Sequence, residues 1–162
     1  MAAIDGSHLD SLAATVLGNL SDEHHWEHLG IHVRGDCGNG RLPRPLVSGL
    51  PPKRIYVHPD EQIEALRRER QSGLGFTHQP EYEWVLPVHV DEKCSISFFA
   101  AIFDSIGPPP RQTCPCHTST GPQEVDATGS ARAKRLLLAT VHDDSTVVFY
   151  LMHDGIVKPR QN

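Results

Sequence analysis

The sequence has few aromatic residues and no long apolar run. Aromatic residues make up 6% of its 162 residues, and no run approaches the roughly 20 apolar residues of a membrane-spanning helix. Residues 1–5 carry no basic flank, so a secretory signal is not expected. The four cysteines lack a disulfide spacing, which indicates reduced thiols. A membrane protein and a disulfide-stapled secreted domain are therefore excluded.

An excess of basic residues is also missing. The net charge is −5, from 15 Lys and Arg against 20 Asp and Glu. Proteins that bind RNA on their own usually present a basic surface, because neutralised phosphates supply much of the affinity. Residues 31–60 hold five bases, whereas residues 1–30 hold none. We therefore expect at most a local basic patch rather than an RNA-binding chain.

Glycine and proline are abundant, with 13 residues of each. The length fits one domain, so we predict a single domain over residues 1–162. Residues 107–133 are rich in Pro, Thr, Ser and Gly, which predicts a disordered insertion there. The ordered core is then expected at about 8–106 and 134–158.

Apolar residues recur at helical spacing in three stretches. We predict helices at about 8–20, 61–71 and 96–106, with Ser7, Asp60 and Ser95 as their N-caps. The third helix has an apolar face made of Ile96, Phe99, Ala100, Phe103 and Ile106. Gly107 and the three prolines after it should end that helix.

β-Branched and alternating apolar residues predict strands at about 29–33, 54–58, 84–90, 135–141 and 146–152. Residues 46–50 are ambiguous, and 35–44 are expected to be loop. Pro87 has no N–H, so its strand should lie at a sheet edge or carry a bulge there. The order α, β, β, α, β, α, β, β predicts an α/β fold. We expect a small, mixed, mostly antiparallel sheet flanked by helices and ending in a β-hairpin.

The terminal hairpin predicts a partner. Its second strand comprises Thr146, Val147, Val148, Phe149, Tyr150, Leu151 and Met152. An antiparallel strand with one wet face should alternate apolar and polar residues, but this strand is apolar on both faces. A helix or another chain must cover the second face. The four-residue loop His142–Ser145 places the carboxylates of Asp143 and Asp144 at the hairpin tip.

These last residues carry the most specific pattern in the chain. Residues 138–150 read LATVHDDSTVVFY, and HDG at 153–155 and then Pro159 follow. This pattern resembles the C-terminal signature of the smallest structural subunit of the eukaryotic tRNA-splicing endonuclease. Trp26 before a strand and the Val-Leu-Pro-Val run at 85–88 fit that family more loosely.

The resemblance implies a fold like the C-terminal domain of that endonuclease and a non-catalytic structural subunit. The enzyme of this family is a heterotetramer of two catalytic and two structural subunits that excises introns from precursor tRNA. The resemblance implies that this chain pairs with a catalytic subunit through the strand at 146–152. It also implies docking of the acidic loop, Asp143 and Asp144, onto the second catalytic and structural pair. Precursor tRNA is then contacted indirectly, no cofactor or metal is expected, and the compartment is the nucleus or the cytosolic face of the mitochondrial outer membrane.

The catalytic subunits of this family use a Tyr, His and Lys triad as general base, general acid and positive charge. Lys134 precedes an apolar strand, as the family's lysine does, and we interpret it as a positional relic. Tyr82 and His89 have suitable chemistry but lack the Gly-rich motif that surrounds the triad. We therefore predict no catalytic residue in this chain.

A metal-dependent nuclease is a first alternative. Pro59-Asp60 and Asp91-Glu92-Lys93 match the loose pattern in which two carboxylates hold Mg²⁺ beside a lysine. Such a short pattern occurs often by chance. A helix cap at Asp60 and a polar turn at 91–93 explain the same residues.

Zinc binding is a second alternative. Cys114, Cys116 and His117 offer ligands, with Cys94 or one of the 11 histidines as a possible fourth. One residue between two cysteines is tighter than the usual spacing of two to four. His24 and His28 would share a face only if that stretch were helical.

A stand-alone homodimeric scaffold is a third alternative, because the same apolar strand could pair with its own copy in the isolated chain. Direct RNA contact by Arg67, Arg68 and Arg70 is a further hypothesis. We interpret these three residues as a solvated helix end.

Overall fold

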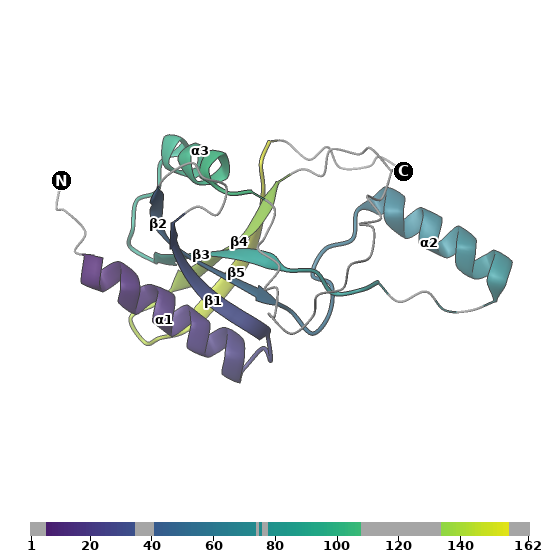
Figure 1. Ribbon diagram of the computed structural model, residues 1–162, viewed down its shortest axis with the longest axis horizontal. Coiled ribbons are helices and arrows are strands. Elements are labelled where there is room, and N and C mark those ends of the chain that lie inside the picture. The colour runs from purple at the N-terminus through teal and green to yellow at the C-terminus, as the bar shows by residue number, and fades with distance from the viewer. Residues whose placement is uncertain (1–5, 35–40, 74, 76–77, 108–133, 156–162) are drawn as a thin grey trace, which may run out of the picture.

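The computed structural model describes residues 6–34, 41–73, 75, 78–107 and 134–155. Three helices and five strands lie within these residues (Figure 1). The helices are α1 (Gly6–Asp22), α2 (Pro59–Ser72) and α3 (Ile96–Ser105). The strands are β1 (Glu27–Arg34), β2 (Arg41–Leu50), β3 (Glu83–His89), β4 (Arg135–Val141) and β5 (Val147–His153). The predicted α/β fold is confirmed, and helices and strands alternate as predicted, but the second strand is β2 rather than residues 54–58.

The five strands form one sheet in the order β1-β2-β3-β4-β5. β3 and β4 are parallel, and the other neighbours are antiparallel. A parallel pair needs a crossover connection, and the chain between β3 and β4 contains α3. The sheet is thus mixed and mostly antiparallel, as predicted, with β1 and β5 at its two edges.

The sheet separates two hydrophobic cores, one under α1 and one under α3. Leu12, Val16 and Leu20 of α1 pack on one face against residues such as Val85 and Ala139. On the opposite face, α3 packs on the sheet through residues that include Ile102, Phe103, Leu86 and Leu136. Side chains alternate between the faces of a strand, so every central strand supplies both cores. Figure 1 shows α2 standing away from the sheet.

Pro87 corrects one expectation, because β3 is the central strand and Pro87 is fully buried. The ladder from β3 to β2 covers only the pairs Val47↔Val85, Ser48↔Trp84 and Gly49↔Glu83. The ladder to β4 continues through His89↔Val141. β3 therefore pairs only with β4 at Pro87, and a central strand tolerates a residue without an N–H where the ladder to its other neighbour has ended, although β2 itself continues to Arg41.

β2 is longer than expected, and the predicted loop at 35–44 was wrong for residues 41–44. The pairing between β1 and β2 shifts register between His32↔Leu46 and Arg34↔Arg41. Pro43 and Pro45 lie in this irregular stretch, where the regular ladder is interrupted. The shift lets the strand contain two prolines, and the sequence pattern alone did not indicate such a shift.

Residues 54–58 do not form the predicted strand. They lie between Pro51-Pro52 and Pro59, and side chains rather than a ladder hold them. The Arg54 guanidinium donates to the Tyr56 carbonyl and pairs with Glu61 and Glu81 at 2.8 and 3.3 Å. Glu81 also pairs with Arg135 at 3.1 Å. This segment is therefore fastened to β4 by charge, and its β-branched residues misled the prediction.

The helix boundaries correct two predicted caps and confirm a third. α1 begins at Gly6 and α2 at Pro59, so Ser7 and Asp60 lie inside the helices rather than at their N-caps. The Ser95 hydroxyl accepts the N–H of Phe98 at 3.1 Å, as a cap should. On α3, Phe103 and Ile106 are buried as predicted, but Ile96 is 89% exposed and Ala100 is exposed.

Gly49 marks where β2 passes closest to its neighbours. A Cβ atom placed there would lie 2.6 Å from the Leu29 Cδ2 atom and 2.9 Å from the Trp26 Cε3 atom. No larger residue fits without moving these side chains.

The predicted insertion lies outside the described residues from residue 108 to 133. Within the described residues, no helix combines the length and the apolar character needed to cross a bilayer.

Candidate partner interface

β5 has an open backbone edge, with which no other strand of the described residues pairs. It is the last strand of the sheet, and its pairing with β4 runs without a shift from Arg135↔His153 to Val141↔Val147. The strand reads VVFYLMH and contains no Asp, Glu, Lys or Arg. We call the backbone and side chains of Val147–His153 the β5 edge.

Two hydrogen bonds at the ends of this ladder fix which backbone groups face outward. The Asp154 N–H donates to the Lys134 carbonyl at 2.8 Å, and the His142 N–H donates to the Thr146 carbonyl at 2.9 Å. Hydrogen-bonded and non-bonded pairs alternate along an antiparallel ladder. Val148, Tyr150 and Met152 therefore bond to β4. The N–H and C=O groups of Val147, Phe149, Leu151 and His153 point to the open edge.

The two side-chain faces of β5 are covered unequally. Val147, Phe149 and Leu151 pack partly against the core under α1. On the other face Met152 packs against the core under α3, whereas Tyr150 is 56% exposed. The second face is thus covered by the core at Met152 but is open at Tyr150, in part as the expectation of a helix or a partner on that face requires.

The hairpin tip, residues 142–146, is a tight turn closed by two backbone bonds. Besides the bond from His142 to Thr146, the Ser145 N–H donates to the His142 carbonyl at 3.0 Å. Ser145 has φ +67°, which is typical of a type I turn followed by a left-handed residue. The tip therefore has a defined shape, with one residue more than the predicted loop.

The two acidic residues at the tip have different partners. One Asp144 carboxylate oxygen accepts the Thr146 N–H at 3.0 Å, and this hydrogen bond lowers the pKa of Asp144 below its ordinary value. Asp143, with 87% of its side chain exposed, lies 3.0 Å from His89 Nε2. The Asp91 N–H donates to His89 Nδ1 at 3.3 Å, so His89 Nε2 carries the proton and donates to Asp143.

His89, Asp91 and Asp143 bring possible metal ligands within 4.8 Å of one another. A histidine that binds a metal through Nε2 needs its proton on Nδ1. Here Nδ1 accepts a backbone N–H instead. The hydrogen bonds of the turn account for this cluster.

The structure does not bring Tyr82, His89 and Lys134 together. The Lys134 ammonium donates to the Phe103 carbonyl at 2.8 Å, at the C-terminal end of α3. His89 pairs with Val141, at the far end of β4, about 20 Å along the strand at 3.3 Å per residue. The Tyr82 ring lies beside His28, with 6.3 Å between ring centroids. Lys134 thus satisfies a helix-terminal carbonyl, a role that sequence spacing did not indicate.

The structure describes only some residues of the two alternative metal sites. Glu92 pairs with buried Arg44 at 2.7 Å, and Asp60 lies in α2. Cys114, Cys116 and His117 lie outside the described residues, while burial raises the pKa of the Cys94 thiol. α1 ends at Asp22, so His24 and His28 share no helical face.

Arg67, Arg68 and Arg70 are exposed in the last part of α2. The Arg68 guanidinium lies 3.9 Å from Glu64, one turn earlier. This agrees with their interpretation as a solvated helix end.

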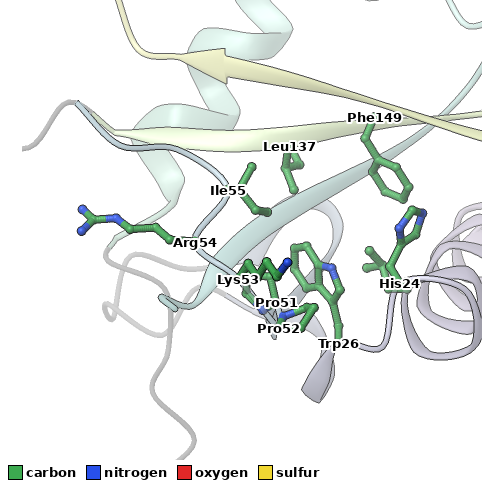
Figure 2. A pocket seen from close by; sticks show the side chains of 10 residues that line it. His24, Trp26, Pro51, Pro52, Lys53, Arg54, Ile55, Leu137 and Phe149 are labelled. Carbon is green, nitrogen blue, oxygen red and sulfur yellow. The ribbon is translucent and has the colours of Figure 1, made fainter. Parts of the chain in front are cut away.

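An apolar cavity of about 370 Å³ lies beside the β5 edge, and sequence reasoning missed it. Leu20 of α1 lines it, and Figure 2 shows the other walls: His24 and Trp26 after α1, the segment 51–55, Leu137 of β4 and Phe149 of β5. The His24 and Phe149 rings meet edge to face, with 5.2 Å between centroids. Trp26 and the pair Pro51-Pro52 were the available sequence signals, but the walls come from distant parts of the chain.

A family model described as "Sen15 protein" matches residues 15–162. The chain belongs to the Sen15 family. The match includes β5 and the hairpin tip. This confirms the family that the C-terminal pattern indicated.

Two curated relatives support the same assignment. This Sen15-family chain is 50% identical over 155 residues to a Neurospora crassa protein named "Probable tRNA-splicing endonuclease subunit tsp-1". The alignment covers 96% of the chain and 67% of that relative. The chain is also 36% identical over 138 residues to a Schizosaccharomyces pombe protein named "Probable tRNA-splicing endonuclease subunit sen15". That alignment covers 85% of the chain and 73% of this second relative.

Proposed function

We propose that this Sen15-family chain is a structural, non-catalytic subunit of a tRNA-splicing endonuclease. In this proposal it pairs with a catalytic subunit, and two such pairs form the heterotetramer that excises introns from precursor tRNA. Family membership and the names of the two relatives support the assignment to this complex.

The single observation that supports the pairing most directly is the open backbone of β5. Val147, Phe149, Leu151 and His153 present N–H and C=O groups at the edge. A strand added there forms a continuous ladder, which supplies affinity through backbone hydrogen bonds. The uncharged side chains and exposed Tyr150 then give the added strand an apolar surface on which to pack.

The hairpin tip suits the second proposed contact. The Asp143 and Asp144 side chains are exposed at the end of a tight turn, and each retains at least one oxygen beyond its local hydrogen bond. A basic groove on the catalytic subunit of the other pair is the complementary surface. Through that subunit the chain reaches precursor tRNA indirectly.

A structural role also agrees with the positions of the candidate catalytic groups. The ammonium of Lys134 is bonded to the end of α3, and His89 lies at the opposite end of the β3–β4 ladder. A general acid and a positive charge for one phosphate must lie within a few ångströms of it. The purified chain alone should therefore leave precursor tRNA uncut.

The test compares one substitution on each edge of the sheet. Tyr150→Asp on β5 should abolish co-purification with the catalytic subunit, because a charge would be buried in the added ladder. Ile31→Asp on β1 is the matched control, since Ile31 is 43% exposed on the opposite edge, and it should leave co-purification intact. Circular dichroism would verify that both variants fold. Retention of the complex by folded Tyr150→Asp would contradict the interface.

The same edge supports a second candidate, self-pairing of the isolated chain as a homodimer. A two-fold axis beside β5 would continue the sheet into a second copy. Sedimentation of the chain alone and of its mixture with the catalytic subunit distinguishes the homodimer from the heterodimer. We expect the heterodimer to replace any homodimer, and a homodimer that persists in the mixture would favour the scaffold.

A further inference from the structure

The cavity beside the β5 edge has a lining suited to an apolar side chain. Leu20, Trp26 and Leu137 are buried core residues that form part of its wall. Atoms lining an empty space lack packing partners on that side. A side chain inserted from outside would restore those contacts.

The cavity is continuous with the β5 edge through one residue. Phe149 presents its backbone N–H to the open edge while its ring lines the cavity. A chain that pairs with β5 therefore passes beside the cavity. Side chains that fill a pocket of the partner and are desolvated there contribute most of the binding energy of an interface.

The polar groups near the cavity do not favour RNA as the occupant. Arg54 lines it, but its guanidinium is engaged by Glu61, Glu81 and the Tyr56 carbonyl. Figure 2 shows that group directed away from the cavity. Lys53 remains as the one lysine in the lining, whereas nucleic-acid sites combine several cations.

We propose that the cavity receives a large apolar side chain of the catalytic subunit, from the segment that flanks its strand paired with β5. This inference rests on the proposed function and adds an anchor point to it. The anchor fixes the position of the partner segment across the edge, whereas a backbone ladder alone permits slippage along an apolar strand.

The experiment fills the cavity from its own wall. Ile55 lines it and is 39% exposed, and Ile31 on β1 is a matched control at 43% exposure. Ile55→Trp and Ile31→Trp would be titrated against the catalytic subunit by biolayer interferometry. We expect Kd to rise roughly tenfold or more for Ile55→Trp and to stay unchanged for Ile31→Trp.

A second variant guards against misfolding of the first. His24 is exposed on another wall, so His24→Trp narrows the cavity while retaining an aromatic ring beside Phe149. Wild-type affinity in either variant, with circular dichroism of the native form, overturns the proposal.

Four outcomes separate this proposal from the others. If the wild type binds, Tyr150→Asp does not and Ile55→Trp binds normally, only the cavity assignment fails. If the wild type does not bind the catalytic subunit, the proposed function fails, and the cavity assignment fails with it. If Ile55→Trp keeps its affinity for the catalytic subunit but loses self-association, the cavity belongs to a contact with a second copy. If it loses precursor-tRNA binding instead, the cavity belongs to an RNA contact. Either result overturns the proposal.

Discussion

The two edges of the sheet differ in regularity and charge. β5 pairs with β4 in one uninterrupted register and contains no Asp, Glu, Lys or Arg. β1 has two register shifts against β2 and includes Glu27 and Arg34. Bulges and charges are the means by which proteins prevent unwanted pairing at sheet edges.

Among the described residues, bulges and charges therefore protect the edge at β1 and not the edge at β5. Both edges expose apolar side chains, since Ile31 and Val33 on β1 are 43% and 42% exposed and Tyr150 on β5 is 56% exposed. Exposed apolar area therefore does not distinguish them, but backbone regularity does. A long, straight and uncharged edge forms a template for another strand, which is the property that the proposed partner requires.

The largest expected effect comes from removing one outward N–H of β5. Leu151→Pro deletes a donor that faces the open edge and leaves the hydrogen bonds to β4 in place. We expect partner affinity to fall by roughly a hundredfold or more, because the ring also blocks close approach of the added strand. Titration against the catalytic subunit measures the loss.

Leu151→Ala is the matched control, because it removes the same side-chain packing but keeps the N–H. It should weaken binding far less than the proline does. Equal affinities in the two variants would show that backbone pairing does not hold the complex, and the contrast between the edges would lose its basis.

A smaller effect is expected at the β1 side of the sheet. Gly49→Ala would press a methyl group against Leu29 and Trp26, and such overpacking lowers the free energy of unfolding by about 1–3 kcal/mol. Gly18→Ala is the control, since nothing lies within 4 Å of a Cβ there and alanine favours a helix by about 0.5–1 kcal/mol. Urea denaturation should therefore move the two midpoints in opposite directions, and a stabilised Gly49→Ala would contradict the packing.

The smallest effect concerns pH at the end of β5. Burial, aided by the charge of Arg135, lowers the pKa of His153 below its ordinary value of 6.5. The unfolded chain then binds this proton more readily, so the stabilisation present above pH 6.5 is lost as pH falls below it. His153→Gln should reduce the decrease in thermal midpoint between pH 7 and pH 5. If the thermal midpoint of His153→Gln falls with pH as much as that of the wild type, a group other than His153 causes the pH dependence.

The elements with strong local signals were predictable from the sequence. The helix at 8–20, the Ser95 cap and the terminal hairpin follow from periodicity and turn chemistry within short windows. Pro87 and residues 54–58 were not predictable in this way. Whether Pro87 is tolerated depends on where the ladder between β2 and β3 ends, and the conformation of 54–58 depends on Arg135 and Glu81, far along the chain.

In the candidate site, too, features formed by continuous stretches were predictable, and features formed by distant segments were not. The apolar strand and the acidic tip are continuous stretches, so their patterns indicated a partner surface. The cavity combines α1, the 51–55 segment and two strands, and only the folded chain brings them together. Lys134 matched a family position, yet its hydrogen bond to Phe103 depends on where α3 ends.

The single parallel pair has a consequence for the order of folding. β4 and β5 are joined by a short turn and can associate within microseconds. Joining Val85 to Leu137 closes a loop of roughly fifty residues, which costs more entropy and is slower. We therefore expect the β4–β5 hairpin to form before β4 pairs with β3, with both faces of β5 exposed in the interval. Assembly beside a newly made partner would shield that hairpin from aggregation before the sheet is complete.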